Sequence, residues 1–365
     1  MSNQVIRVLI VDDSAFMRTV ISQMLAAAPD IEVVGQAADG KEGLRLARDL
    51  KPDVITLDVE MPILSGLETL PILMRSHPTP VIMLSTLTEE GAEVTIKALE
   101  LGAVDYLPKN MEGGPLGMRH IAPELIAKVR AIGAGNTREA LIQSMRRSTP
   151  RPVQETTQAT GPGLASNYFP VVAIGCSTGG PTALSSLLPQ FPTDFSGAIL
   201  VVQHMPATFT NALAQRLDGL CGLAVKQAEE GAPIIPGTIL VAKGGHHLTV
   251  RKEHGGLVAH LSDAPKCPTM PAVDELFRSL AEVCPERTLG AVLTGMGQDG
   301  LEGARALSAA GSPVLAQAET GCLVYGMPKA VVDAGLAADA VQLSEMYNTI
   351  YLNLPTGSPS RPLVG

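Results

Sequence analysis

The sequence predicts an α/β protein made of two doubly wound parallel-sheet domains. Short apolar strands alternate with amphipathic helices over residues 1–132 and again over residues 169–352. Such alternation is typical of βα units, which build a parallel sheet with helices on both faces. Residues 133–168 are rich in Pro, Thr, Ser, Gln and Gly and show no apolar period, which indicates a flexible linker between the domains. We expect a disordered tail at residues 353–365.

The first region is expected to hold five strands. Each is a short apolar run, and amphipathic stretches with helical spacing separate the early ones. Strands are predicted at residues 5–14, 31–38, 53–62, 79–87 and 104–109, with helices at 16–29 and 40–52. This order favours a parallel sheet with helices on both faces.

The second region is expected to be a Rossmann-like domain with an added antiparallel hairpin region. Main-sheet strands are predicted at 169–175, 197–205, 288–296 and 312–317, with helices at 209–217, 271–283, 301–311 and 343–354. Between them lies a β-rich patch with Gly-rich turns, at 237–243, 246–252 and 256–262. We expect these three segments to pair as antiparallel hairpins beside the main sheet.

Polar side chains are expected at the carboxyl ends of the strands in the first region. Asp12 and Asp13 end the first strand, Asp58 the third, Ser85 the fourth and Lys109 the fifth. Ligands of doubly wound sheets bind at this edge, and converging carboxylates suit Mg²⁺. With the metal and the lysine neutralising charge, Asp58 would be a nucleophile that accepts a phosphoryl group. Any one acid alone is more simply explained as a solvated strand end or helix cap.

The motifs "VLIVDDS", "DVITLDVEMPILSG", "VIMLSTLT" and "GAVDYLPK" resemble the response-regulator receiver domain, from residue 5 to about 130. The resemblance implies a flavodoxin-like five-stranded sheet and phosphorylation of Asp58. It also implies Mg²⁺ bound by Asp13, Asp58 and the carbonyl of Glu60. Ser85 and Tyr106 would be the switch pair that moves on phosphorylation.

The sequence departs from the receiver pattern after the fifth strand. The family usually has Lys-Pro there, with a cis bond, whereas Asn110 follows Lys109 in this chain. A cis bond before a residue other than proline costs about 3 kcal/mol, against under about 1 kcal/mol before proline. The resemblance therefore does not decide the geometry of this loop, although Lys109 itself matches the family pattern.

The stretch "AIGCSTGG", residues 173–180, holds Ser177 in a G-x-S-x-G pattern. Alone, it favours a glycine-rich turn over a nucleophile. A nucleophilic serine needs a base, and the base needs an orienting carboxylate. His204 is the histidine at the end of a predicted main-sheet strand, and Asp299 lies in the turn "GMGQDG". Adjacent parallel strands would bring Ser177 and His204 together on one edge.

The helix after Ser177 is expected to begin near Pro181. The free N–H groups of "STGG" would then face the site and could stabilise an oxyanion. The chain order Ser, His, Asp excludes the α/β-hydrolase family, which runs Ser, Asp, His, but not the chemistry. Cys176 is disfavoured as an alternative nucleophile, because a residue adjacent to Ser177 would point another way.

The motifs "IGCSTGGPTAL", "VVQHMPATFT" and "VLTGMGQDGLEGARAL" resemble the CheB family of chemotaxis protein-glutamate methylesterases, over about residues 169–350. The resemblance implies that Ser177 is the nucleophile, His204 the general base and acid, and Asp299 the residue that orients His204. The family's oxyanion donors map to the backbone of Thr178 and Met296.

The same resemblance implies a substrate, a reaction and partners. The substrates would be glutamate γ-methyl esters of methyl-accepting chemoreceptors, hydrolysed with release of methanol and without a cofactor. Receptor glutamines would also be deamidated, and a chemotaxis histidine kinase would donate the phosphoryl group. A non-catalytic signalling adaptor of the same fold stays open as an alternative. A transcriptional regulator would need a helix-turn-helix after the receiver, and the second region offers none.

The composition of the 365-residue chain limits its partners. A formal net charge of −9 argues against nucleic acid as a binding partner. The five cysteines are an odd number without a C-x-x-C pair, so neither a disulfide framework nor a zinc site is expected, and reduced thiols fit a cytoplasmic location. With no signal peptide and no apolar run of roughly 18 residues, membrane insertion is not expected. We expect a monomer.

Overall fold

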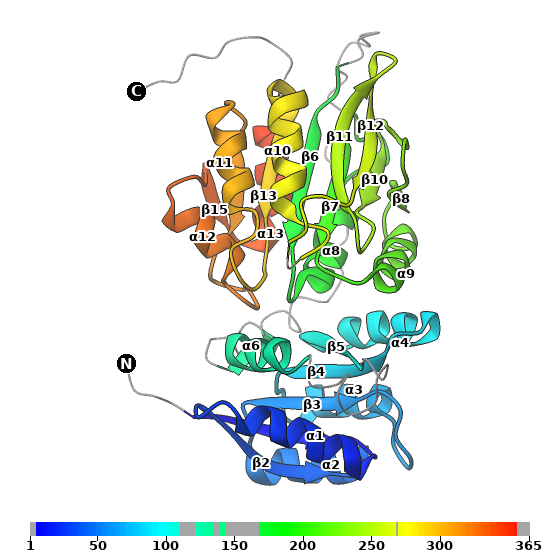
Figure 1. The fold of residues 1–365 in the computed structure, drawn as a ribbon, viewed down its shortest axis with the longest axis vertical. Coiled ribbons are helices and arrows are strands. Elements are labelled where there is room, and N and C mark those ends of the chain that lie inside the picture. The colour runs from blue at the N-terminus through cyan, green and yellow to red at the C-terminus, as the bar shows by residue number, and fades with distance from the viewer. Residues whose placement is uncertain are drawn as a thin grey trace.

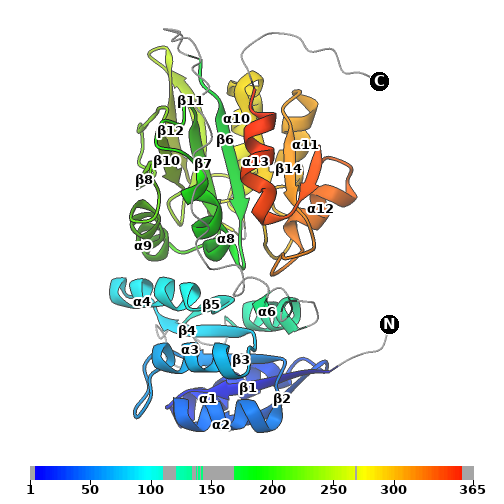
Figure 2. The ribbon, with the colours of Figure 1, turned by 180° about the vertical axis from the view of Figure 1, so that it is seen from behind.

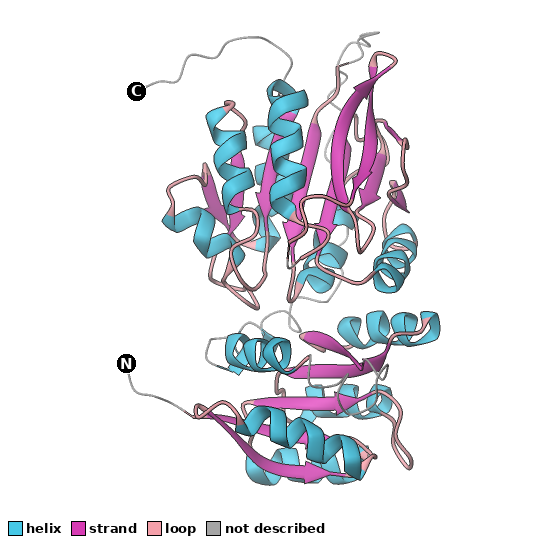
Figure 3. Ribbon diagram, viewed as in Figure 1, coloured by secondary structure: helices cyan, strands magenta, loops and turns pink. Residues whose placement is uncertain are grey.

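The computed structural model describes residues 5–109, 121–133, 137, 139, 141–142, 168–267 and 269–355. Two domains lie one above the other along the long axis of the molecule (Figure 1). The N-terminal domain extends to residue 133, and the C-terminal domain begins at residue 168. Each contains a parallel sheet flanked by helices (Figure 3), which confirms the predicted fold class.

The N-terminal domain is built on a five-stranded parallel sheet of order β2-β1-β3-β4-β5. This is the flavodoxin-like order, in which the site lies where β1 and β3 adjoin. The strands are β1 (Ile6–Val11), β2 (Ile31–Ala37), β3 (Val54–Asp58), β4 (Val81–Thr86) and β5 (Asp105–Lys109). The helices are α1 (Ala15–Ala26), α2 (Gly40–Leu50), α3 (Gly66–Ser76), α4 (Glu89–Glu100) and α6 (Ala122–Gly133).

Side-chain caps fix where the helices of this domain begin. Ser14 and Asp39 each accept a hydrogen bond from a backbone N–H in the first turn of α1 and α2. Ser65 and Glu68 form a reciprocal capping box at α3, and Thr88 caps α4. Such caps satisfy N–H groups that have no partner within the helix. Helices α1, α2 and α4 therefore start shortly after the strands that precede them, whereas a longer segment separates α3 from β3.

The C-terminal domain is built on a seven-stranded sheet of order β15-β14-β13-β6-β7-β10-β8, in which every neighbouring pair is parallel. The strands are β6 (Val171–Cys176), β7 (Ala198–Gln203), β8 (Ala224–Gln227), β10 (Thr238–Val241), β13 (Thr288–Val292), β14 (Val314–Gln317) and β15 (Asp339–Val341). The α-helices are α8 (Gly180–Leu187), α9 (Ala207–Asp218), α10 (Val273–Val283), α11 (Leu301–Ala309), α12 (Met327–Asp333) and α13 (Leu343–Asn353).

Helices cover both faces of this sheet. Helices α10 and α11 lie on the face seen in Figure 1, and α8 and α13 lie on the opposite face, seen in Figure 2. All residues of β6, β7 and β13 are buried. This agrees with the continuous apolar runs read from the sequence, because a strand covered on both faces does not alternate.

The predicted hairpin region is only partly correct. Strands β11 (His247–Glu253) and β12 (Gly256–Ser262) form an antiparallel hairpin, and β9 (Pro233–Ile234) joins it to make a separate three-stranded sheet. The segment 237–243 does not join the hairpin. Its strand β10 runs parallel between β7 and β8 in the main sheet. Three of its four residues are buried, and this continuous burial, rather than alternation, marks a strand covered on both faces.

Two strands of the main sheet, β8 and β15, were not predicted at all. Both lie at an edge of the sheet, and both carry exposed residues. They are also short, with four and three residues. Neither segment therefore shows the apolar run that revealed the central strands.

Part of the predicted linker is helical. The described residues between 133 and 168 include Thr137, Glu139, Leu141 and Ile142, all in helical conformation. The hydroxyl of buried Thr137 donates a hydrogen bond to the carbonyl of Leu323 at 2.9 Å. Thr137 therefore packs on the C-terminal domain. The rest of the predicted linker and most of the predicted tail lie outside the described residues.

The two domains touch through α4 and β5 of one and α8 and α9 of the other (Figure 1). The rings of Tyr106 in β5 and Phe209 in α9 stack with centroids 4.6 Å apart. Glu100 at the end of α4 forms an ion pair with Arg216 of α9. The interface thus combines a buried aromatic contact with a charged pair at its margin.

No helix in the described part of the chain is both long enough and apolar enough to cross a bilayer.

Gly66 is required where α3 starts against β3. A Cβ on this residue would lie 2.0 Å from the carbonyl oxygen of Asp58 and 3.0 Å from its carbonyl carbon. We expect Gly66→Ala to destabilise the N-terminal domain by about 1–3 kcal/mol, because backbone atoms must shift to admit the methyl group. Scanning calorimetry should show a lower melting temperature for this domain.

The matched control is Gly219→Ala, where the nearest heavy atom would be 3.5 Å from the added Cβ. We expect this variant to melt within a degree or two of the unmodified chain. A Gly66→Ala variant that melts like the Gly219→Ala variant contradicts the steric argument.

Candidate active site

Three polar residues lie at the carboxyl edge of the C-terminal sheet. Ser177 directly follows β6, His204 directly follows β7, and Asp299 lies in the loop between β13 and α11. Strand β6 pairs with both β7 and β13, and Cys176 at its end lies opposite Gln203. The ends of β6 and β7 lie at the side of the sheet nearest the N-terminal domain (Figure 1). The strand adjacency expected from the sequence is present.

His204 is held by a firmly anchored carboxylate. Its Nε2 lies 2.7 Å from Oδ2 of Asp299. Asp299 also accepts hydrogen bonds from the backbone N–H groups of Val273 at 2.7 Å, Asp274 at 3.0 Å and Gly300 at 2.9 Å. Burial alone would raise the pKa of Asp299, but His204 and the N–H donors outweigh burial and lower it. An ionised Asp299 favours the tautomer or cation of His204 that carries a proton on Nε2.

The second ring nitrogen of His204, Nδ1, remains available on the other side of the ring. Neither Nδ1 nor Oγ of Ser177 makes a hydrogen bond with another described residue. Both residues are partly exposed. Contacts between a nucleophile and its base are often long in structures without substrate, so this arrangement leaves Nδ1 as the acceptor for a serine proton.

Two backbone donors beside Ser177 are unused. The N–H groups of Thr178 and Met296 donate to no other described group, although Thr178 is only 3% exposed. Gly295, which precedes Met296, lies so close that a Cβ there would be 2.9 Å from Cβ of Ser177. Buried N–H groups without a partner are uncommon, and a pair of them can bind an oxygen that becomes negatively charged.

The carboxylates predicted in the N-terminal domain also come together. One oxygen each of Asp12, Asp13 and Asp58 lie within 4.8 Å of one another. Lys109 Nζ lies 2.6 Å from Oδ2 of Asp58 and 3.0 Å from Oδ2 of Asp12. Burial raises the pKa of Asp58 to about 6, against the opposing effect of Lys109. Such a set of carboxylate oxygens fits a hard divalent cation.

The remaining predicted residues of this domain lie on β4, on β5 and shortly after β3. Ser85 is buried, and its hydroxyl donates to the carbonyl of Gly91 in α4 at 3.1 Å. Tyr106 is 4% exposed and lies in the domain interface, where burial raises its pKa. Glu60 is an exposed residue shortly after β3. Asn110, on which the expected departure in loop geometry depends, lies outside the described residues.

Sequence analysis missed one residue that links the two sites. Oδ2 of Asp105, the first residue of β5, accepts a hydrogen bond of 2.6 Å from the hydroxyl of Thr178. The same carboxylate lies 3.0 Å from Nζ of buried Lys128. Burial alone would lower the pKa of Lys128, but Asp105 and Glu124 raise it. The sequence signal that could have identified Asp105 was the presence of an acid within the apolar segment "VDYLPK", next to the predicted switch residue Tyr106.

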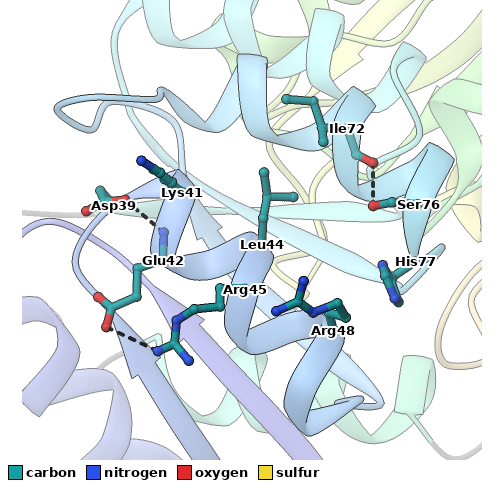
Figure 4. A pocket seen from close by; sticks show the side chains of 9 residues that line it. All are labelled: Asp39, Lys41, Glu42, Leu44, Arg45, Arg48, Ile72, Ser76 and His77. Carbon is teal, nitrogen blue, oxygen red and sulfur yellow. Dashed lines mark hydrogen bonds and ion pairs between the residues drawn. The ribbon is translucent and has the colours of Figure 1, made fainter.

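A surface hollow lies elsewhere, between α2 and α3 of the N-terminal domain (Figure 4). Its lining mixes apolar side chains such as Leu44 and Ile72 with charged ones such as Lys41 and Arg45. It shares no residue with the carboxylate cluster or with the serine site. We therefore assign it no part in either site.

Comparison with known families matches both domains. The model of the response regulator receiver domain matches residues 8–117, and that of the CheB methylesterase matches residues 172–350. A curated relative from Oleidesulfovibrio alaskensis, named protein-glutamate methylesterase/protein-glutamine glutaminase 1, is 45% identical over 94% of this chain and 98% of its own length. A relative from Thermotoga maritima with the corresponding name is 43% identical over 92% of this chain and 95% of its own.

Two solved structures match the domains separately. The catalytic domain of Thermotoga maritima CheB methylesterase is 38% identical and covers 50% of this chain and 97% of that chain, with a TM-score of 0.49. The response regulator domain of Thermotoga maritima CheB is 54% identical and covers 35% of this chain and 95% of that chain, with a TM-score of 0.33.

The sequence relatives are more than 40% identical and cover nearly the whole chain, and in this chain the receiver match precedes the methylesterase match. The chain therefore belongs to the family of protein-glutamate methylesterases/protein-glutamine glutaminases.

Proposed function

We propose that this chain is a receiver-regulated protein-glutamate methylesterase that also acts as a protein-glutamine glutaminase. The observation that carries the proposal is the 2.7 Å hydrogen bond between His204 and Asp299 at the edge where Ser177 follows β6. Family membership supports the same activity. The N–H groups of Thr178 and Met296, which have no partner among the described residues, complete the set of groups that acyl transfer requires.

In the first step, Oγ of Ser177 attacks the carbonyl carbon of a glutamate γ-methyl ester. His204 takes the serine proton, and the N–H groups of Thr178 and Met296 stabilise the oxyanion. Asp299 stabilises the imidazolium through Nε2 without accepting its proton. Collapse of the tetrahedral intermediate breaks the carbon–oxygen bond, and the imidazolium protonates the departing methoxide to give methanol.

In the second step, water attacks the acyl-enzyme. His204 takes a proton from the water and returns one to Oγ of Ser177, which leaves a free glutamate on the substrate. Glutamine follows the same route, with ammonia leaving in place of methanol. No cofactor is required for either reaction.

The carboxylate cluster in the receiver is proposed to accept a phosphoryl group on Asp58. Mg²⁺ would be held by Asp12, Asp13 and Asp58, with the backbone carbonyl of Glu60, and would neutralise charge on the transferring group. Lys109 is the fixed cation beside Asp58, 2.6 Å away. The kinase that donates the phosphoryl group would be a chemotaxis histidine kinase, the substrates would be methyl-accepting chemoreceptors, and the location would be cytoplasmic.

The receiver is proposed to restrain the active site until Asp58 is phosphorylated. Its Asp105 is bonded to Thr178, the residue after the nucleophile, and its Tyr106 stacks on Phe209 of the helix that follows His204. Ser85 and Tyr106 would form the switch pair. Repositioning of Tyr106 would then weaken a contact on which the closed arrangement of the domains depends.

Replacing the nucleophile tests the catalytic assignment. We expect Ser177→Ala to lower methanol release from a methylated receptor by about a thousandfold or more, because the acyl-enzyme cannot form. The matched control is Ser186→Ala, which removes an exposed serine of α8 whose hydroxyl bonds only the carbonyl of Thr182 among described groups. Methanol release that persists in Ser177→Ala contradicts the serine mechanism. If the unmodified chain and both variants release no methanol, the result favours an adaptor without catalysis.

A charge reversal tests the restraint by the receiver. Arg216 and Glu100 form the ion pair between α9 and α4. We expect Arg216→Glu to raise the esterase rate of the unphosphorylated chain about twofold to fivefold, since exposed ion pairs contribute about 0.2–1 kcal/mol. Methanol release without a phosphoryl donor is the measurement.

The control for this reversal is the double variant Arg216→Glu with Glu100→Arg, which restores an attractive pair. We expect its rate to return toward that of the unmodified chain. An increase that remains in the double variant would show that the effect comes from α9 itself and not from the interface.

A further inference from the structure

The side chain of Gln203 lies between the predicted nucleophile and the predicted base. Gln203 ends β7 and is only 2% exposed. Its Nε2 donates one hydrogen bond to the carbonyl of Ser177 at 3.0 Å and another to the carbonyl of His204 at 3.3 Å. Its Oε1 accepts a hydrogen bond of 3.1 Å from the thiol of Cys176. One buried amide therefore connects the backbone of both catalytic residues.

The chemistry of the neighbours fixes which way this amide points. Two carbonyl oxygens face one end of it, and only the NH₂ group can donate to both. The thiol faces the other end, and burial raises the pKa of Cys176, so the sulfur remains a donor. A flipped amide would set Oε1 of Gln203 against two carbonyl oxygens and lose the two hydrogen bonds that Nε2 donates to them.

The carbonyl that Gln203 holds belongs to the same peptide unit as the N–H of Thr178. A trans peptide is planar, and its C=O and N–H point in opposite directions. Holding the oxygen of Ser177 therefore sets the direction of the Thr178 N–H, which has no partner among the described residues. The N–H of Gly180 also donates to this oxygen, at 2.8 Å. Two donors occupy both lone pairs, so rotation of the peptide would break two hydrogen bonds.

The turn is shaped around this amide. A Cβ on Gly180 would lie 1.9 Å from Oε1 of Gln203 and 3.0 Å from Sγ of Cys176. The backbone of Gly180 is helical and not left-handed, so the glycine is required by close packing and not by its own conformation. Gln203 leaves no room for a methyl group at the start of α8.

We propose that Gln203 is a positioning residue, which holds the Ser177–Thr178 peptide so that the Thr178 N–H faces the developing oxyanion. The inference rests on the proposed function. Gln203 contacts neither substrate nor reacting atoms, and it acts through the direction of one N–H group. Its contribution therefore appears only when negative charge forms on the substrate oxygen.

The test compares two substrates that differ at this oxygen. One is a peptide with a glutamate γ-methyl ester, and the other is its thionoester analogue, in which sulfur replaces the carbonyl oxygen. Sulfur is the weaker hydrogen-bond acceptor, so the thionoester gains less from the N–H donors. Methanol release from both is measured over a range of concentrations and pH with the full chain and with Gln203→Met, which preserves side-chain length.

We expect Gln203→Met to lower kcat for the oxygen ester about tenfold to a hundredfold, with KM within twofold, because the lost interaction acts in the transition state. The thionoester rate should fall much less, so the ratio of the two rates collapses. The pH dependence should keep its shape, since the substitution does not alter the hydrogen bond between the side chains of His204 and Asp299. The matched control is Gln190→Met, an exposed glutamine bonded to the carbonyl of Ser186, which should leave both rates unchanged.

A parallel loss on both esters, or no loss on either, overturns the role of Gln203 while leaving the proposed function intact. If the unmodified chain hydrolyses neither ester, the proposed function itself is wrong, and the inference falls with it. If Gln203→Met does not fold, Gly180→Ala decides, because its methyl group displaces the same amide. A selective loss on the oxygen ester supports the proposal, and an equal loss overturns it.

Discussion

The parallel pairing of β6 with β7 on one side and β13 on the other is the constraint on which the active site depends. Parallel strands that pair in register end at one edge, so the residues after them must meet. Ser177 and His204 follow β6 and β7 directly. Asp299 comes from the loop after β13 and is fixed by N–H groups of Val273 and Asp274 at the start of α10. The apolar core therefore determines the geometry of the polar edge.

The described contacts of the receiver with the C-terminal domain include several on elements that carry the site. Tyr106 stacks on Phe209 in α9, the helix that begins three residues after His204. Asp105 accepts a hydrogen bond from the hydroxyl of Thr178, whose N–H donates to no group in the described part of the chain. A displacement of β5 would thus act on the nucleophile turn and on the helix after the base together. The interface does not need to be large to influence the site.

The central strands and the residues at their ends were predictable from the sequence, for an identifiable reason. Buried parallel strands are continuous apolar runs, so β6, β7 and β13 could be located, and with them the residues at their ends. Strands β8 and β15 were missed because edge strands are short and partly exposed. Strand β10 was placed in the hairpin region because neighbouring glycine turns suggested antiparallel pairing. Asp105 and Gln203 were not identified, since their roles depend on contacts with Thr178 and the Ser177 carbonyl that no sequence spacing encodes.

Thr178 is the residue on which regulation and chemistry converge. Its side chain is bonded to the receiver carboxylate of Asp105, its carbonyl accepts the hydroxyl of Thr294 at 2.9 Å, and its N–H is aligned through the peptide that Gln203 holds. Hydrogen bonds to charged groups contribute about 1.5–3 kcal/mol, so the Asp105 contact alone could bias the closed arrangement by about tenfold or more. Thr294 and Gln203 hold the backbone at Thr178 independently of the receiver. Loss of the hydrogen bond between Asp105 and Thr178 can therefore open the proposed site without changing the direction of the Thr178 N–H. In the proposed mechanism, the domain contact controls access, while the catalytic domain retains its own alignment.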